Sequence, residues 1–280
     1  MHAVCRNSSA KHATLNILYV QISILKRDNM PRTDTQKNKG AGHQQDEISQ
    51  IDATGNFEIR KLINRDKKHK CGNKSKICVK IVAAANLPSR FGDFTVVAFY
   101  NNKDDKENAA FISGNVYGKR KVPVRIHSEC LTGDVAGSLR CDCRDQLEAS
   151  FKLIGKRKFG VLIYLRQEGR GIGFINKIKA YHLQDQGLDT YEANRALGFR
   201  ADERDYAIAA HIIKTLDIKS IKLISNNPKK FNDLKRHGIV IAGRIPLATK
   251  PNSYNLKYLM TKRDKSKHLL ENLPPHSKGV

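Results

Sequence analysis

The strongest constraint on the fold of this 280-residue chain is an alternation of short apolar runs and amphipathic segments between residues 121 and 247. The run KFGVLIYL (158–165) is almost entirely apolar, which is typical of a strand buried on both faces. Other elements are expected around it: strands at 121–130, 220–226 and 239–247, and helices at 147–154, 174–187, 202–216 and 227–238. This order predicts an α/β fold, which we expect to be a three-layer α/β/α domain with a mixed sheet.

The chain before residue 121 divides into two parts. Residues 77–88 and 91–100 are β-rich runs separated by a Pro-Ser turn, so we expect a hairpin there. Residues 31–76 are polar and lysine-rich without sustained periodicity, and such a composition buries too little apolar surface to offset the entropy of ordering it. We therefore expect a basic, disordered extension over 1–75, a folded domain over 76–271 and a tail over 272–280. The lysine-rich sequence after residue 247 is expected to lie at the surface.

The charge of the chain is strongly basic. It contains 51 lysine and arginine residues against 27 aspartate and glutamate residues, a net charge of +24. This excess suits nucleic acid, a membrane surface or a polyphosphate ligand, and does not by itself choose among them. The apolar stretch LNILYVQISIL (15–25) is too short to cross a bilayer and is not followed by a small-residue cleavage site. We expect a cytoplasmic protein without a membrane partner.

Three of the six cysteines, Cys130, Cys141 and Cys143, lie together in CLTGDVAGSLRCDC. Their uneven placement is unlike the disulfide framework of a small secreted domain and favours a metal site or a reactive thiol. All three can reach one zinc ion at Zn–S distances near ~2.3 Å, whereas His127 on the preceding strand is expected to point to the opposite face. An open fourth position would hold a water with a pKa near ~7. Buried thiols without a metal, or a structural zinc completed by histidine, are the alternatives.

A glycine-rich segment, YLRQEGRGIGFINK (164–177), connects a buried strand to a helix. Its backbone amides, the start of the helix, and Arg166 and Arg170 can bind phosphate groups. The spacing matches neither a Walker loop nor a dinucleotide fingerprint, and glycines after a strand are also common for steric reasons. A phosphate-binding loop is therefore one of two interpretations.

Three further features each allow a structural and a functional interpretation. Asp202 opens the predicted helix 202–216, where it can form a capping box with Asp205. Lys229 and Lys230 begin the next helix and can either meet a phosphate or be solvated. Tyr181 follows the glycine-rich segment on its helix, where a tyrosine ordinarily packs in the core with its hydroxyl at the rim.

Taken in order, the motifs RIHSECLTGDVAGSLRCDC, YLRQEGRGIGFINKIKAYHLQDQGLDTYEANRALGF, ADERDY and NNPKK resemble the GTP cyclohydrolase II family over roughly residues 77–270. The resemblance implies a zinc-dependent hydrolase that converts GTP to formate, diphosphate and 2,5-diamino-6-ribosylamino-4(3H)-pyrimidinone 5′-phosphate, the first step of riboflavin biosynthesis. It also implies one Zn²⁺ per subunit, Mg²⁺ with the triphosphate, and a homodimer. The folded domain would then be the catalytic domain.

The resemblance assigns roles to single residues. Cys130, Cys141 and Cys143 would bind the zinc ion. Asp202 would accept a proton, and Arg204 and Tyr181 would complete the catalytic group. Arg204 would either attack the α-phosphorus or stabilise its charge, and a pKa above ~12 makes a guanidinium a poor nucleophile. The residues implied to contact GTP are Arg125, Ile126, His127, Ser128, Glu129, Gln146, Glu168, Gly169, Arg170, Thr190, Ser225 and Lys230.

Two positions depart from the family pattern. Arg144 stands where the family usually has glycine, and a positive φ at this site would strain the loop. Ser225 stands where threonine is common, which retains the hydroxyl. Arg144 is the reason to keep one alternative, a GTP-binding relative with lost turnover or with ring opening but no formate release. The other alternative, a zinc-stabilised nucleic-acid-binding protein, predicts aromatic residues among the charges, which the C-terminal segment nearly lacks, so we expect no nucleic-acid partner.

Overall fold

The computed structural model describes residues 51–52, 57–67, 76–104, 106–247, 249–270 and 273. The apolar stretch 15–25, most of the predicted extension and most of the predicted tail lie outside these residues. Among the helices of the described part, none is long and apolar enough to cross a membrane.

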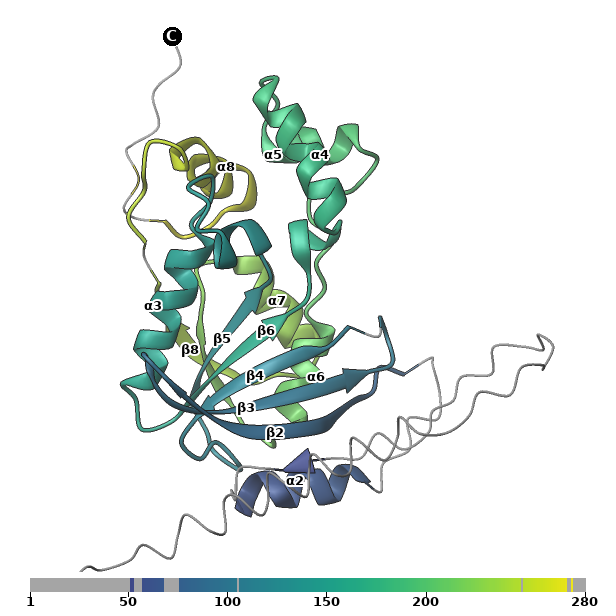
Figure 1. The fold of residues 1–280 in the computed structure, drawn as a ribbon, viewed down its shortest axis with the longest axis vertical. Coiled ribbons are helices and arrows are strands. Elements are labelled where there is room, and N and C mark those ends of the chain that lie inside the picture. Colours follow the sequence, from purple (N-terminus) through teal and green to yellow (C-terminus); the bar gives the residue numbers. More distant parts are fainter. Residues whose placement is uncertain are drawn as a thin grey trace, which may run out of the picture. The chain divides into compact units, whose positions relative to one another are not determined.

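An eight-stranded mixed sheet forms the centre of the domain, in the order β1-β2-β3-β4-β6-β5-β7-β8 (Figure 1). The strands are β1 (Ile51–Asp52), β2 (Val79–Ser89), β3 (Gly92–Asn101), β4 (Asn108–Ser113), β5 (Val122–Ser128), β6 (Gly160–Leu165), β7 (Ile221–Ile224) and β8 (Ile241–Ile245). Neighbours from β2 to β6 pair antiparallel, beginning with the predicted hairpin β2–β3, whereas β6, β5, β7 and β8 pair parallel. The predicted mixed sheet is therefore confirmed.

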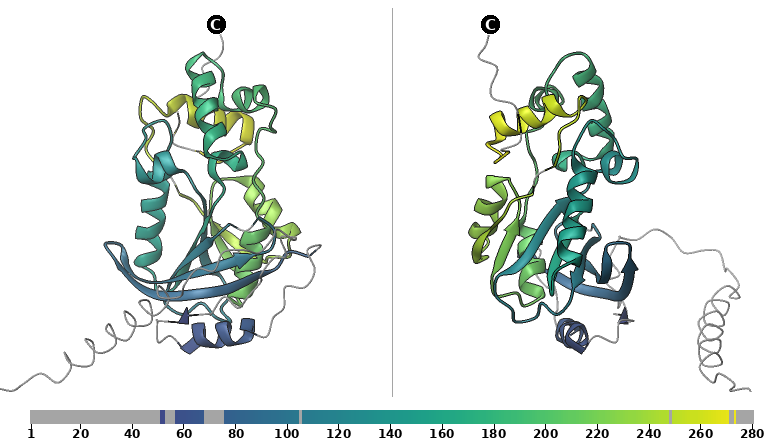
Figure 2. Two further views of the ribbon diagram at one scale, coloured as in Figure 1. Left: turned by 45° about the vertical axis from the view of Figure 1, so that its right-hand side comes forward. Right: turned by 90° about the vertical axis from the view of Figure 1, so that its left-hand side faces the viewer.

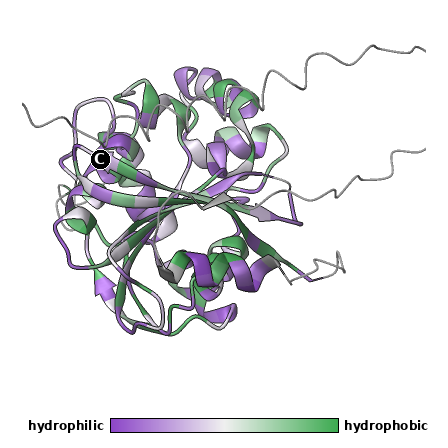
Figure 3. Ribbon diagram, turned by 60° about the horizontal axis from the view of Figure 1, so that its bottom comes forward, coloured by the Kyte–Doolittle hydropathy of each residue, from purple (hydrophilic) through white to green (hydrophobic). Residues whose placement is uncertain are grey.

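Helices cover both faces of this sheet (Figures 1 and 3). They are α2 (Phe57–Lys67), α3 (Cys143–Gly155), α4 (Phe174–Asp185), α5 (Thr190–Ala196), α6 (Ala207–Thr215), α7 (Pro228–Arg236) and α8 (Leu256–Ser266), with a π-helical turn η1 (Leu131–Val135) and a 3₁₀ turn η2 (Glu168–Gly171). On one face, Ile154 of α3 packs with Phe94 and Leu162 of the sheet. On the other, α2, α6 and α7 contribute to a second apolar core. These layers confirm the predicted α/β/α architecture.

The chain connections create a crevice beside β5. The chain leaves β5 through α3 to reach β6 on one side, and later returns through α6 to reach β7 on the other side. A reversal of this kind in an open α/β sheet leaves a ligand-binding crevice at the carboxyl ends of the strands. Helices α4, α5 and α8 lie beyond this end of the sheet in each view (Figures 1 and 2).

The start of α6 differs from the prediction. The helix expected over 202–216 begins at Ala207, and the Oδ1 atom of Asp205, not Asp202, accepts a hydrogen bond from the Ala207 amide (2.6 Å). The preceding residues are instead tied to the glycine-rich segment, since the Glu203 amide donates to the Arg170 carbonyl (3.0 Å). This long-range pairing keeps Asp202 in a loop.

Helix α2 lies within the segment that was expected to be disordered. Its residues Ile59, Leu62 and Ile63 share one face and are at most 4 % exposed, within the core that includes β2. Asp66 ends this face, and its Oδ2 atom accepts a hydrogen bond from the Ile81 amide (3.0 Å). The helix was not predicted because three apolar residues in a lysine-rich context give only a weak periodic signal. The stability of such a short helix comes from packing against the sheet.

Candidate active site

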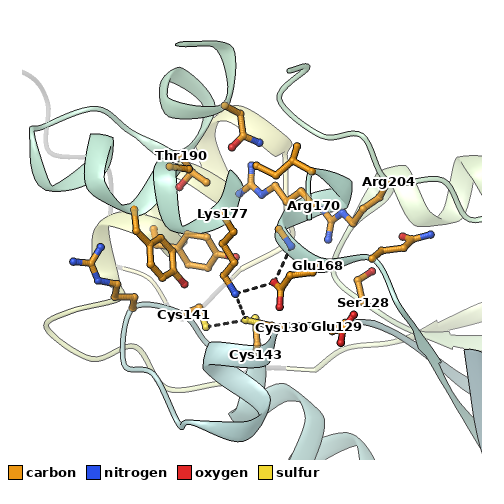
Figure 4. A pocket seen from close by; sticks show the side chains of 18 of the residues that line it. Ser128, Glu129, Cys130, Cys141, Cys143, Glu168, Arg170, Lys177, Thr190 and Arg204 are labelled. Atoms are coloured by element: carbon orange, nitrogen blue, oxygen red, sulfur yellow. Dashed lines mark hydrogen bonds and ion pairs between the residues drawn. The ribbon is translucent and has the colours of Figure 1, made fainter. Parts of the chain in front are cut away.

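Three thiols converge at the carboxyl end of β5 (Figure 4). The sulfur atoms of Cys130, Cys141 and Cys143 lie within 4.8 Å of one another, and 3.7 Å separates the first two. None of the three forms a disulfide. Two thiolates at ~2.3 Å from one tetrahedral zinc ion lie about 3.8 Å apart, so both the donor atoms and their spacing fit zinc.

A glycine makes this convergence possible. Cys130 follows β5, the chain turns through η1, and Cys143 opens α3. A Cβ atom at Gly133, in the middle of η1, would lie 2.9 Å from the sulfur of Cys141 and 3.0 Å from that of Cys130. Any side chain at this position would therefore push the sulfurs apart.

The carboxylate of Asp134 stabilises the turn η1 through three hydrogen bonds. It accepts hydrogen bonds from the amide of Cys130 (3.0 Å), from Nε2 of His127 (2.9 Å) and from the hydroxyl of Tyr164 (2.9 Å). His127 is therefore engaged by Asp134, and among the described residues the metal-ligand group consists of the three cysteines alone. The sequence had not singled out Asp134, because its partners come from two different strands.

A buried lysine lies against the thiols. Lys177 of α4 donates from Nζ to the sulfur of Cys130 (3.1 Å) and to Oε1 of Glu168 (2.8 Å) (Figure 4). The pKa of Cys130 is lowered, because the thiols of Cys141 and Cys143 donate hydrogen bonds to it and the Lys177 ammonium adds a nearby positive charge. These contacts favour the thiolate form of Cys130. Lys177 could not be identified from the sequence, where its one signal is its position one helical turn before Tyr181.

Tyr181 faces the same turn from α4. Its hydroxyl lies 3.1 Å from Oγ1 of Thr132, and the guanidinium of Arg140 lies over its ring at 4.9 Å. Burial raises the pKa of Tyr181, so its hydroxyl stays protonated at neutral pH. The position fits a proton donor beside the thiol cluster.

Two adjoining cavities open at the strand ends. The predicted residues that line the first are Ser128, Glu129, Cys130, Cys141, Cys143, Glu168, Gly169, Arg170, Tyr181, Thr190 and Arg204. The second adds Arg125, His127, Gln146, Ser225 and Lys230. Ser128 and Arg204 line both cavities, so the two lie side by side.

Two predicted residues line neither cavity. The side chain of Ile126 is fully buried in the apolar core, because alternate residues of β5 point to opposite faces, and only its carbonyl oxygen meets the site by accepting a hydrogen bond from Lys230 Nζ (2.6 Å). Asp202 instead forms an ion pair with Arg204, at 2.8 Å between Oδ2 and Nη2. The predicted contact of Ile126 with GTP stays a prediction, and its side chain lines neither cavity.

The second cavity is cationic. Arg125, Arg204 and Lys230 all line it, and the pKa of Lys230 is lowered by burial and by the two neighbouring guanidinium groups. Within the described residues, the Nε atom of Arg125 and the Nδ1 atom of His127 are buried without a hydrogen-bond partner. Buried polar atoms are normally paired, so these atoms indicate that a ligand completes the site.

The glycine-rich segment has an unusual backbone. Gly169 and Arg170 both have φ of 62°, and Gly171 has φ of 95°. A left-handed conformation at a non-glycine residue such as Arg170 is uncommon and tends to occur at functional sites. Arg170 lines both cavities, whereas Arg166 points elsewhere and donates from Nε to Glu129 Oε2 (3.0 Å).

Arg144 does not strain the loop. It lies in the first turn of α3, and its φ is not among the positive values of the described residues. Its side chain donates to the carbonyl oxygens of Asp134 (3.4 Å) and Val135 (3.3 Å), and to Glu148 Oε1 (3.2 Å). Arg144, in place of the glycine that is usual in the family, therefore adds contacts to η1. It gives no support to the alternative of a relative that has lost turnover.

The C-terminal segment is part of the site, although it was expected to lie only at the surface. Tyr258 of α8 lines both cavities, and Lys262 and His268 line the second. Lys262 pairs with the buried Asp142. The sequence could not indicate these roles, because a lysine-rich helix has no apolar stripe that would reveal its buried side.

The fold and site together define an α/β enzyme with a thiol cluster beside a cation-lined cavity. Its family follows from comparison with known proteins: the family model described as GTP cyclohydrolase II matches residues 80–246, and the chain belongs to this family. It is accordingly a hydrolase of riboflavin biosynthesis.

Individual relatives agree with this assignment. The chain is 55 % identical over 191 residues to a GTP cyclohydrolase-2 of Picrophilus torridus, covering 68 % of this chain and 99 % of that protein. It is 52 % identical over 193 residues to a GTP cyclohydrolase-2 of Aeromonas hydrophila, covering 69 % and 98 %. It is also similar to the riboflavin biosynthesis protein RibBA of Bacillus subtilis, 53 % identical over 185 residues, which cover 66 % of this chain and 46 % of that protein.

Proposed function

We propose that the chain binds GTP in the two adjoining cavities and hydrolyses it to formate, diphosphate and the 2,5-diamino-6-ribosylamino-pyrimidinone 5′-phosphate. The observation that carries this proposal is the position of the three thiols beside the cationic cavity in one crevice. Such a crevice can hold a purine at the thiol end while the cations bind its phosphates.

Cys130, Cys141 and Cys143 would hold one zinc ion. Bound there, zinc would supply a water acidified to a pKa near ~7 for attack on C8 of the guanine ring. Lys177 would offset part of the negative charge of the thiolates, and Glu168 would fix Lys177 by its ion pair (2.8 Å). Tyr181, protonated because burial raises its pKa, would donate a hydrogen bond to the ring as it opens.

The triphosphate would bind among the cations of the second cavity. An anion there would satisfy Arg125 Nε and offset the repulsion that lowers the pKa of Lys230. Arg170, held in its left-handed conformation, and the hydroxyl of Ser225 would contribute further donors. Mg²⁺ would accompany the triphosphate and neutralise part of its charge.

Arg204 would act as a cation and not as a nucleophile. Its pKa is raised above the already high value of a guanidinium, since Tyr206 and the Asp202 carboxylate outweigh the effect of burial. A permanently charged guanidinium stabilises charge on a phosphorus centre but has no lone pair with which to attack it. Asp202 would accept a proton once the phosphates draw Arg204 away.

A homodimer would cover an apolar surface of the site. Large apolar side chains are exposed between the cysteines and on α4: Leu131, Val135, Leu139, Phe174, Ile175 and Ile178. Leu131 and Phe174 line one groove. Apolar groups gathered in this way favour association, and a second copy is the partner that the family resemblance implies. Analytical sedimentation measures the oligomeric state and so tests the proposed homodimer. The cytoplasmic location of the protein stays a prediction.

Product analysis tests the proposed function. Zinc-loaded protein is incubated with GTP and Mg²⁺, and formate, diphosphate and the pyrimidine are measured separately, the last by mass spectrometry. We expect equal amounts of all three products. Unchanged GTP, or a formylated pyrimidine in place of formate, would reject the full reaction in favour of a relative with lost or partial turnover.

A further inference from the structure

Helix α8 is joined to the thiol cluster by a buried ion pair. Nζ of Lys262 lies 2.6 Å from Oδ1 of Asp142, and the two side chains are 13 % and 1 % exposed. Asp142 stands between Cys141 and Cys143 in the sequence, so it belongs to the backbone that carries both sulfurs. Lys262 comes after residue 246, the last residue that the family model matches.

The ion pair continues into the cavity. The other oxygen of Asp142 accepts a hydrogen bond from Gln146, whose Oε1 atom accepts one from Nη2 of Arg125 (2.6 Å). Arg125 then donates from Nη1 to the carbonyl of Ile224 at the end of β7 (3.2 Å). A continuous polar chain thus runs from α8 through the cysteine loop to the central strands.

The segment around α8 is anchored at more than one point. Lys262 lies 4.3 Å from the centre of the Tyr258 ring, which lines both cavities. After the helix, the Leu269 amide donates to the Asn226 carbonyl (3.0 Å), beyond the end of β7. Figure 2 shows α8, coloured yellow, beyond the ends of the central strands.

We propose that Lys262 is a positioning residue that fixes the Cys141–Cys143 loop and Gln146 through Asp142. The proposal makes α8 a required part of the active site, and it rests on the proposed function. A buried carboxylate that loses its ammonium partner is destabilised, and it regains solvation if the loop moves. That movement would displace two metal ligands and the Gln146–Arg125 contact together.

The test compares five proteins: the full-length wild type, Lys262→Met, Lys262→Arg, the double variant Asp142→Asn/Lys262→Met, and the control Lys257→Met. Lys257 lies on the same helix but is exposed. Three quantities are measured: kcat and KM for formate release, the rate of zinc transfer to the chelator 4-(2-pyridylazo)resorcinol, and hydrogen exchange of residues 130–147.

We expect Lys262→Met to release zinc roughly tenfold faster or more, and to lower kcat by a similar factor, since contacts that orient metal ligands have effects of this size. Exchange of residues 130–147 should increase. Lys262→Arg should restore most of the loss by keeping the charge pair, and the double variant should recover part of it, because no unpaired charge remains. A purely structural role would lower the melting temperature and leave zinc release and kcat of the folded protein unchanged.

The proposal is overturned if Lys262→Met matches Lys257→Met in zinc release and in exchange of residues 130–147. These two measurements do not depend on turnover. Absence of formate from the wild type would therefore refute the proposed function while the exchange and zinc data still decide the role of Lys262.

Discussion

Arg204 and Asp202 form a two-point ion pair, with Nε 2.9 Å from Oδ1 and Nη2 2.8 Å from Oδ2. Their side chains are 17 % and 18 % exposed. The pKa of Asp202 is held well below its usual range, because Arg204 and Lys229 outweigh the opposing effect of burial. Each of the two predicted catalytic residues is thus bound to the other, and in the proposed reaction the triphosphate would separate them before Asp202 accepts a proton.

The first prediction concerns the pH dependence of stability. Because the pKa of Asp202 is lower in the folded than in the unfolded protein, where it is about 3.9, the pair stabilises the fold fully above that value. This stabilisation is lost as the pH falls through the folded-state pKa. We expect Asp202→Asn to lower the free energy of unfolding by about 2 kcal/mol at pH 7 and by clearly less at pH 3. Urea unfolding at both pH values measures this, and an equal difference at both would contradict it.

The second prediction separates two roles of Arg204. If the guanidinium acts by its charge, Arg204→Lys should keep diphosphate release well above that of Arg204→Ala, although roughly 100-fold below the wild type, because an ammonium retains the charge without the two-point geometry. A nucleophilic role predicts that both variants are equally inactive. Arg200→Lys is the matched control, since Arg200 is 81 % exposed.

The third prediction concerns Gly133. We expect Gly133→Ala to abolish zinc binding, since its Cβ atom would lie 2.9 Å from the sulfur of Cys141. Gly137→Ala is the control on the same loop: its φ of +67° makes alanine costly by about 1 kcal/mol, but its nearest neighbour is 4.0 Å away. Atomic emission measures the zinc content of the two variants and so tests this prediction. Equal zinc content in both variants would show that the turn adapts.

The fourth prediction separates the chemistry of the ring from that of the phosphates. Cys141→Ser replaces a soft thiolate by a hard hydroxyl, so zinc content should fall and formate release should stop. Diphosphate release should continue, because Arg204 and the cations of the second cavity are unchanged. Formate at the wild-type rate from zinc-free variant would refute the proposed zinc-bound water. Loss of both products together with the circular dichroism signal would show that the metal also holds the fold.

The fifth prediction concerns α2. A chain that begins at Lys76 lacks Ile59, Leu62 and Ile63, each of which contributes about 2 kcal/mol when buried. We expect this chain to be several kcal/mol less stable than one that begins at Glu47, with a similar kcat at low temperature, because α2 supplies no residue to either cavity. Thermal unfolding measures the stability of the two chains, and formate assays measure their kcat. A chain from Lys76 with undiminished stability would show that the contact of α2 with the sheet is weak.

Much of the fold was predictable because it depends on local patterns. The run 158–165 is apolar at nearly every position, so only a strand buried on both faces suits it, and β6 is found at Gly160–Leu165. The amphipathic segment at 227–238 likewise became α7. Helix α5 and strand β4 were not predicted, because segments of seven and six residues are too short for a period to be read from them.

The sequence by itself determined the alternation of strands and helices, the three cysteines and the motifs of the family. Only the tertiary structure decided which charged residues are buried and with whom they pair. Lys177 and Lys262 look like the other lysines of a strongly basic chain, yet one contacts Cys130 and the other Asp142. The reason is that a contact between residues 47 or 120 positions apart depends on how the helices pack over the sheet, and a local sequence pattern contains no information about such pairs.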